Sequence, residues 1–165
     1  MSPDELADRL RATHPDAVVA RGQVSISVDP GPLAGTLREL RDDPELRLDF
    51  LSGITASDWP GRVPRYWLAY ELYSIDLRHR LRVKVGLPDD APRLPSVVEV
   101  FPTANWHERE TYDMFGIVFD GHPDLRRILM PEGWEGHPLR KTEELGGVNT
   151  QYKGAFIPPV DKRTQ

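Results

Sequence analysis

Apolar residues recur along the N-terminal part of the chain at two periods, and these periods predict its first elements. Residues 4–13 carry leucines four positions apart behind a Ser-Pro start, which predicts a short amphipathic helix. Residues 24–28 alternate between apolar and polar side chains and run into a Pro-Gly-Pro turn, which favours a strand. Residues 33–41 return to the helical period before an Asp-Pro stop. The predicted opening is therefore α-β-α.

Three further alternating runs follow, with no helical pattern between them. The first begins at Leu46 and continues towards Ile54, and residues 66–73 and 81–87 then alternate so that one side of each run is apolar. The last two runs are predicted to form a hairpin with one buried and one solvated face. We therefore predict an α+β fold, with a mainly antiparallel sheet covered by helices on one face.

Two short helices are predicted after the sheet. Ser96 is a candidate cap for a helix that runs through Phe101. Asn105 is a candidate cap for the next helix, with Glu108 three residues on as the acid of a capping box. Gly116 is well placed to end that helix.

The remainder of the chain lacks regular elements. Residues 117–165 are rich in glycine and proline and show almost no sustained period, which is unusual inside a compact domain. We therefore predict an α+β domain, residues 1–116, followed by an extended irregular tail, residues 117–165, that gains order from a partner.

Composition and charge exclude several functions. The formal charge is −5, from 21 basic and 26 acidic residues, and no basic block interrupts the chain, which argues against bulk nucleic-acid binding. The chain has no cysteine, so it forms no disulfide and offers no thiolate to an iron–sulfur cluster or zinc ion. The first residues are acidic rather than signal-like, and no apolar stretch approaches the roughly 18 residues of a membrane span. We therefore expect a cytoplasmic location, with no direct membrane span.

Charged and aromatic residues that are candidates for a functional site are most concentrated in residues 106–116. Helical geometry predicts two faces, one with Trp106, Arg109, Glu110 and Asp113 and the other with Tyr112 and Phe115. Arg109 and Asp113 are spaced for an ion pair, whereas Glu110 and Asp113 would repel each other unless a cation lies between them. This helix is either a solvated, salt-bridged element or a docking helix for a basic partner surface.

Catalytic motifs are missing from the sequence. His107 and His122 are too far apart to form a helical zinc pair, and neither a glycine-rich phosphate loop nor a G-x-S-x-G elbow occurs. The pairs Arg126-Arg127 and Arg140-Lys141 each follow an X-Pro turn. Three roles are open for these cations. They are solvated, they form ion pairs with the acidic residues of the helix in residues 106–116, or they face the same partner as that helix.

At these residues the sequence closely resembles the 30 kDa subunit family, also called the C subunits, of the proton-pumping NADH:quinone oxidoreductase, respiratory complex I. The resemblance rests on Glu108-Arg109-Glu110, Asp113-Met114-Phe115, His122, Arg126 and Ile128-Leu129. It continues through Met130-Pro131, Trp134 and the run from Gly136 to Lys141. Many members of this family have an acid directly after that run, whereas Thr142 stands here and Glu143 follows.

The resemblance implies a subunit without catalytic, cofactor-binding or metal-binding residues, since FMN, iron–sulfur clusters and quinone belong to partner subunits. It implies a place in the peripheral arm at the cytoplasmic face of the cell membrane, packed against subunits D, B and I, in support of electron transfer from NADH to quinone. The residues expected to fix the helix and tail for that partner contact are Glu108, Arg109, Glu110, Asp113, His122, Arg126 and Arg127.

Three alternatives stay open. The equivalent subunit of an energy-converting hydrogenase, or of a dehydrogenase with another electron donor, would carry the same pattern. A stand-alone hydrolase would use Glu110 and Asp113 with a metal ion. A nucleic-acid binder would use the four cations Arg126, Arg127, Arg140 and Lys141.

Overall fold

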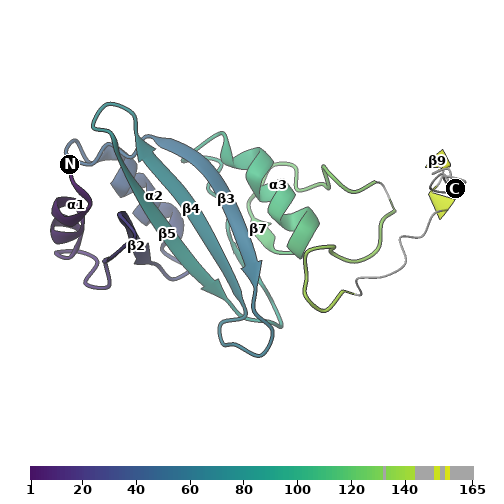
Figure 1. Ribbon diagram of the computed structural model, residues 1–165. Helices are drawn as coiled ribbons and strands as arrows, with labels where there is room; N and C mark the ends of the chain where they lie inside the picture. The colour runs from purple at the N-terminus through teal and green to yellow at the C-terminus, as the bar shows by residue number, and fades with distance from the viewer. Residues whose placement is uncertain (132, 144–150, 153–154, 157–165) are drawn as a thin grey trace, which may run out of the picture.

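The computed structural model describes residues 1–131, 133–143, 151–152 and 155–156 of the chain. Its main feature is a five-stranded sheet with the strand order β1-β2-β5-β4-β3 (Figure 1). The strands are β1 (Val18–Ala20), β2 (Gln23–Ser27), β3 (Phe50–Asp58), β4 (Tyr66–Ser74) and β5 (His79–Leu87). Strands β3, β4 and β5 are antiparallel neighbours, whereas β2 runs parallel to β5. This mainly antiparallel sheet and the helices packed with it confirm the predicted α+β class.

The inner face of the sheet forms the core. Every second residue of β4 from Tyr66 to Leu72 is buried, and β5 alternates in the same way. The predicted helices α1 (Pro3–Leu10) and α2 (Leu33–Asp42) place their buried leucines in the same cluster. Figure 1 shows α2 behind the strands. Among the described residues, no helix has the length and apolar character needed to cross a membrane.

The third helix, α3 (Ala104–Phe115), packs against β3 and ends at Gly116, as predicted, with a left-handed φ of 70°. It is flanked by two short parallel strands, β6 (Arg93–Pro95) and β7 (Val118–Asp120). Ile117 and Phe119 are buried, so the residues directly after α3 still pack in the core. Further along lie the strands β8 (Gln151–Tyr152) and β9 (Ala155–Phe156), and the rest of the predicted tail beyond residue 143 lies outside the described residues.

Strand β3 begins later than the alternating pattern predicted. Leu46 and Leu48 are buried, but they lie in an irregular segment, and the strand begins at Phe50. The N–H groups of Leu46 and Arg47 both donate to the carbonyl oxygen of Asp43, which closes a turn at the end of α2. Alternating burial within this turn therefore imitates the pattern of a strand.

The predicted helix from Ser96 through Phe101 is wrong. The N–H of Ser96 donates to the carbonyl oxygen of Asp120, which extends the pairing of β6 with β7. A single turn follows, in which the N–H of Phe101 donates to the carbonyl oxygen of Val97. The hydroxyl of Ser96 does accept a hydrogen bond from the N–H of Val98 at 3.3 Å, as a capping serine would, but a single turn forms there in place of the predicted helix.

The predicted capping box of α3 is also wrong. The helix begins at Ala104, Thr103 stands at the N-cap position without a side-chain hydrogen bond, and Asn105 lies inside the first turn. The carboxylate of Glu108 instead accepts a hydrogen bond from the buried N–H of Val97. This N–H needs an acceptor because water cannot reach it.

Candidate functional site

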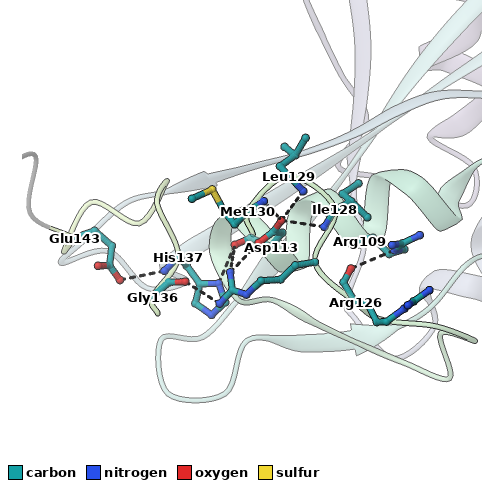
Figure 2. A network of polar contacts seen from close by, with 10 residues as sticks. Arg109, Asp113, Arg126, Ile128, Leu129, Met130, Gly136, His137 and Glu143 are labelled. Atoms are coloured by element: carbon teal, nitrogen blue, oxygen red, sulfur yellow. Dashed lines mark hydrogen bonds and ion pairs between the residues drawn. The ribbon is translucent and has the colours of Figure 1, made fainter. Parts of the chain in front are cut away.

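Asp113, near the C-terminal end of α3, joins this helix to the segment that follows β7. Its carboxylate accepts hydrogen bonds from three successive backbone N–H groups, at 3.1 Å from Ile128 and at 2.8 Å from Leu129 and Met130 (Figure 2). The guanidinium of Arg127 lies 2.7 Å from the other carboxylate oxygen. Because the Asp113 side chain is fully buried, water does not compete for these charge-assisted bonds.

The predicted pairing of Arg109 with Asp113 is wrong. The Nε atom of Arg109 donates to the carbonyl oxygen of Arg126, and its guanidinium lies 5.2 Å from the ring centroid of Trp106. Glu110 and Asp113 do not share a face either, since Glu110 is exposed and Asp113 is buried. The cation that offsets the charge of Asp113 therefore comes from a later part of the chain.

The hydrogen-bond donors around Asp113 also set its charge state. Burial by itself would raise the pKa of this carboxyl group. The N–H of Met130, the guanidinium of Arg127 and the neighbouring N–H groups outweigh burial and hold the pKa below its usual value. Asp113 is thus a stable carboxylate at neutral pH.

A longer stretch, residues 126–131 and 133–143, is fastened to the end of α3, and we call it the anchored loop. A helix end leaves carbonyl oxygens without partners inside the helix. Here three of these oxygens accept hydrogen bonds from the anchored loop. The carbonyl oxygen of Asp113 accepts one from Nδ1 of His137 at 3.0 Å, and that of Met114 accepts one from the N–H of Leu139 at 3.0 Å. The carbonyl oxygen of Phe115 accepts one from Nε of Arg140 at 2.6 Å. The anchored loop therefore caps α3.

Gly116 makes this close packing feasible. Its φ of 70° is a conformation that other residues rarely adopt. A Cβ atom at this position would lie 2.5 Å from side-chain atoms of both His137 and Arg140. The glycine thus serves both the turn after α3 and the approach of the anchored loop.

Glu108 and His122 form a second buried contact between α3 and the rest of the site. The Glu108 carboxylate accepts a hydrogen bond from the hydroxyl of Ser96 and another from the backbone N–H of Val97, both at 2.7 Å. Nε2 of His122 lies 3.2 Å from the carbonyl oxygen of Asn105, and its Nδ1 lies 3.0 Å from the N–H of Asp124. A neutral imidazole with its proton on Nε2 satisfies both contacts. This Nε2 atom lies 4.0 Å from Glu108.

The protonation of Glu108 is sensitive to pH near neutrality. Burial raises the pKa of Glu108 to about 7, although the bonds from Val97 and Ser96 oppose this rise. The buried hydroxyl of Tyr70 finds no hydrogen-bond partner within the described part of the chain, and burial together with Glu108 raises the pKa of that hydroxyl. Near neutral pH, Glu108 in α3 is therefore present in both its neutral and its charged form.

The residues predicted to fix a partner contact divide into two groups. Glu108, Asp113, His122 and Arg127 hold the chain together, as described above. Trp106, which is 64% exposed, lies beside Arg109, and the Arg126 side chain is 73% exposed and bonded to Asp124. Glu110 is exposed one helical turn after Trp106. We call Trp106, Arg109, Glu110 and Arg126 the α3 surface.

One pair of site residues was not predicted from the sequence. Arg65 donates two hydrogen bonds, of 2.7 and 2.9 Å, to the buried carboxylate of Asp58, which also accepts from the N–H of Lys141 at 2.8 Å. Arg65 and this backbone bond hold the pKa of Asp58 below its usual value. The pair ties the far end of the anchored loop to the β3–β4 connection. The signal in the sequence is the opposite charge of these residues at the two ends of a Pro-Gly turn.

The polar groups of this site serve mainly to join α3 to the anchored loop through hydrogen bonds and ion pairs. In the part of the chain that the structure describes, no three His, Cys, Asp or Glu side chains are grouped to hold a metal ion. Buried ion pairs hold the helix and the anchored loop in one orientation. Tryptophan and arginine, the residue types most enriched at interface hot spots, face outward from this frame.

The sequence matches a known protein family over most of its length. Residues 26–149 match the family described as "Respiratory-chain NADH dehydrogenase, 30 Kd subunit". The chain is 52% identical over 146 residues to the C subunit of the NADH-quinone oxidoreductase of Saccharopolyspora erythraea, which covers 88% of this chain and 59% of that relative. It is 52% identical over 155 residues to the protein of the same name from Roseiflexus castenholzii, covering 92% and 88% of the two chains. The chain thus spans less than two thirds of the first relative and most of the second.

Solved structures share the fold. One is titled "Nqo5 of the trypsin-resistant fragment (1-134) in P63 form"; it has a TM-score of 0.64 and 29% identity, and covers 76% of this chain and 100% of the fragment. Another belongs to an archaeal respiratory membrane complex, the membrane-bound sulfane sulfur reductase. Its TM-score is 0.69 with 26% identity, and 98% of each chain is covered.

Proposed function

This chain belongs to the family of the respiratory-chain NADH dehydrogenase 30 kDa subunit, and we propose that it is a structural subunit of a proton-translocating NADH:quinone oxidoreductase. In this role it would carry no cofactor, and FMN, iron–sulfur clusters and quinone would be bound by other subunits. The absence of cysteine from the sequence supports this assignment, because iron–sulfur clusters are held mainly by thiolates.

The observation that carries this proposal is the network around Asp113. Ordering a loop costs conformational entropy, and this chain offsets that cost with a buried carboxylate, an arginine and three backbone N–H donors. The result is a preorganised surface, and preorganisation raises affinity for a partner because less order has to be gained on binding. A cofactor-free subunit that packs against neighbours needs such a surface.

We propose that the chain supports electron transfer from NADH to quinone by packing against subunits D, B and I in the peripheral arm, at the cytoplasmic face of the cell membrane. In this proposal the α3 surface faces a partner, while Glu108, Asp113, His122 and Arg127 hold it in place. Part of the predicted tail, residues 117–165, adds to this partner contact.

Affinity purification tests this function. The full chain is tagged in its own cell, membranes are extracted in mild detergent, and co-migrating proteins on a native gel are identified by mass spectrometry. We expect subunits B, D and I, the flavin subunit and membrane subunits, together with NADH-dehydrogenase activity. A chain that migrates alone would exclude the proposal.

A second candidate follows from the archaeal structure. Its match over nearly the whole chain favours the same structural role in a respiratory membrane complex fed by another electron donor. The same purification separates the two candidates. A flavin-containing NADH-oxidising subunit in the complex supports the first, and a membrane complex that assembles without such a subunit supports the second.

A further inference from the structure

The outer face of the sheet is an extended surface that the elements of the described residues leave uncovered. The helices of the described residues bury their apolar sides in the core on the inner face. On the other face, the outward positions of β4 and β5 are half-buried or exposed. In Figure 1 the strands β3, β4 and β5 lie nearer the viewer than α2. One solvated face is common in antiparallel sheets, so a binding role needs further evidence.

The first piece of evidence is a hollow in this face. Ala69 on β4 lies directly between Thr55 on β3 and Lys84 on β5, so a short side chain is flanked by longer ones. The cavity has a volume of about 270 Å³, and its walls include Trp67, Arg82 and Lys84. A hollow with Ala69 at its bottom and with Trp67, Arg82 and Lys84 at its sides can bind a side chain or a short segment of another molecule.

One end of the hollow is built by close packing. Pro64, in the β3–β4 connection, folds over Gly86, where a Cβ atom would lie 2.4 Å from Cγ of the proline and 3.5 Å from the Trp67 ring. The same connection carries Trp59, 45% exposed, whose indole N–H donates to the hydroxyl of Ser57 at 3.0 Å. The ring of Trp67, which forms the wall of the hollow, therefore lies against Gly86, and Trp59 lies outside the hollow.

The second piece of evidence is charge. Arg80, Arg82 and Lys84 alternate along the outer side of β5, whereas Glu71 is the acidic residue at the outward positions of β3, β4 and β5. Glu71 pairs with Arg82, and Lys84 has no ion-pair partner among the described residues. A cationic face stands out on a chain whose formal charge is −5.

We propose that the outer face around Ala69 is a second docking surface, separate from the α3 surface, which binds a carboxylate-bearing segment of a neighbouring protein subunit. A carboxylate of this segment pairs with the ammonium of Lys84, and an adjoining apolar side chain packs against Trp67. The inference rests on the proposed function, because it needs a multi-subunit complex to supply the segment.

A single cysteine can report whether this face is covered. The chain has no cysteine of its own, so Thr55→Cys places one thiol at the exposed edge of the hollow. The tagged variant is treated with a maleimide as free chain, in the detergent-extracted complex and after denaturation. We expect labelling in the complex to be slower than in the free chain by about tenfold or more, as a covered surface requires.

The chemistry of the occupant is tested through Lys84. A carbodiimide joins amines directly to carboxylates that contact them, so in the complex it should link Lys84 to an Asp or Glu of another subunit, identified by mass spectrometry. In Lys84→Arg the charge stays but the amine is lost, so the complex should assemble and the link should disappear. Lys84→Glu should weaken retention in the complex by about tenfold, because two like charges would meet.

The outcomes are distinct. Slow labelling together with a Lys84–carboxylate link supports the proposal. Equal labelling in the free chain and in an intact complex overturns it while leaving the proposed function standing, whereas a chain without any partner overturns both. Slow labelling without a link overturns the carboxylate segment as occupant. Protection that is lost on removal of anionic lipid assigns the face to a membrane surface instead and also overturns the proposal.

Discussion

At the residue scale, the main constraint on the site is the carboxylate of Asp113. Its four donors lie 14 to 17 positions later in the chain, so this side chain fixes the first part of the anchored loop to α3. One oxygen accepts three N–H groups and the other accepts Arg127. Only an ionised carboxylate offers acceptors on both sides.

Asp113→Asn therefore destabilises the isolated chain. In either orientation, the amide N–H₂ group would face either Arg127 or the three backbone N–H groups, so donors would meet donors. We expect a loss of about 2 to 4 kcal/mol in the free energy of unfolding, measured by urea denaturation. Asp124→Asn, which alters an exposed pair with Arg126, is the control and should change stability little. Equal effects of the two substitutions would contradict the central role of Asp113.

Gly116 and Gly121 form a matched pair for a second prediction. Both have a positive φ, of 70° and 81°, so alanine strains the backbone similarly at each position. Only at Gly116 would the added Cβ meet other atoms, those of His137 and Arg140. Gly116→Ala should thus lower the free energy of unfolding by about 1 kcal/mol or more beyond Gly121→Ala. Limited proteolysis should also show faster cleavage of the anchored loop in Gly116→Ala, and matching profiles would refute the contact.

At the scale of elements, Glu108 makes the attachment of α3 dependent on pH. Its pKa rises from an ordinary value near 4.5 in the unfolded chain to about 7 in the folded chain. Between these two pKa values the folded state keeps a proton that the unfolded state loses. The contribution of Glu108 to the free energy of unfolding is therefore most favourable below about pH 4.5 and is lost as pH rises through about 7. The charged form costs roughly 3 kcal/mol at higher pH.

Glu108→Gln should remove this decline, because a neutral amide still accepts the N–H of Val97 and contacts Ser96. Urea unfolding at about pH 4.5, where the unfolded-state carboxyl is still half protonated, and at about pH 8 measures the effect. We expect the substitution to change stability little at the lower pH and to raise it, relative to the original chain, at the higher pH. An unchanged pH dependence in the variant would show that another group causes it.

Elements with a sustained local period could be predicted from the sequence. The helices α1 and α2 and the hairpin of β4 and β5 follow their apolar patterns closely. The three-residue strand β1 is too short to show a period, and the parallel pairing of β2 with β5 joins residues that are far apart in sequence. The start of α3 was mispredicted because Glu108 bonds to a distant N–H rather than to its own helix end.

The sequence indicates which residues form the candidate site, but it does not indicate which of them bond to each other. The acidic helix and the arginine pair were both identified, and an internal bridge was one of the predicted options. The choice of Arg127 rather than Arg109 as partner of Asp113 depends on burial, which places Asp113 on the inner side of α3. Spacing along a helix cannot reveal that choice, because it describes only neighbours on the same helix.

At the scale of the whole molecule, neighbouring residues serve two separate needs. Arg127 is mostly covered and pairs with Asp113, whereas Arg126 is mostly exposed on the α3 surface. Buried charges fix the position of the anchored loop, and in the proposed function the exposed ones face another subunit. Stability of the chain and assembly of the complex should therefore respond to different substitutions.

Alanine at each of these two arginines separates the roles. Arg127→Ala leaves the buried carboxylate of Asp113 without its cation, so the isolated chain should unfold at a lower urea concentration. Arg126→Ala should leave that midpoint nearly unchanged, yet reduce the amount of chain retained in the complex on a native gel by about tenfold, because a charge facing the partner is lost. If Arg126→Ala unfolds the isolated chain as readily as Arg127→Ala does, Arg126 is a structural residue and the α3 surface loses its charged contact. If both variants assemble normally, the partner binds elsewhere on the molecule.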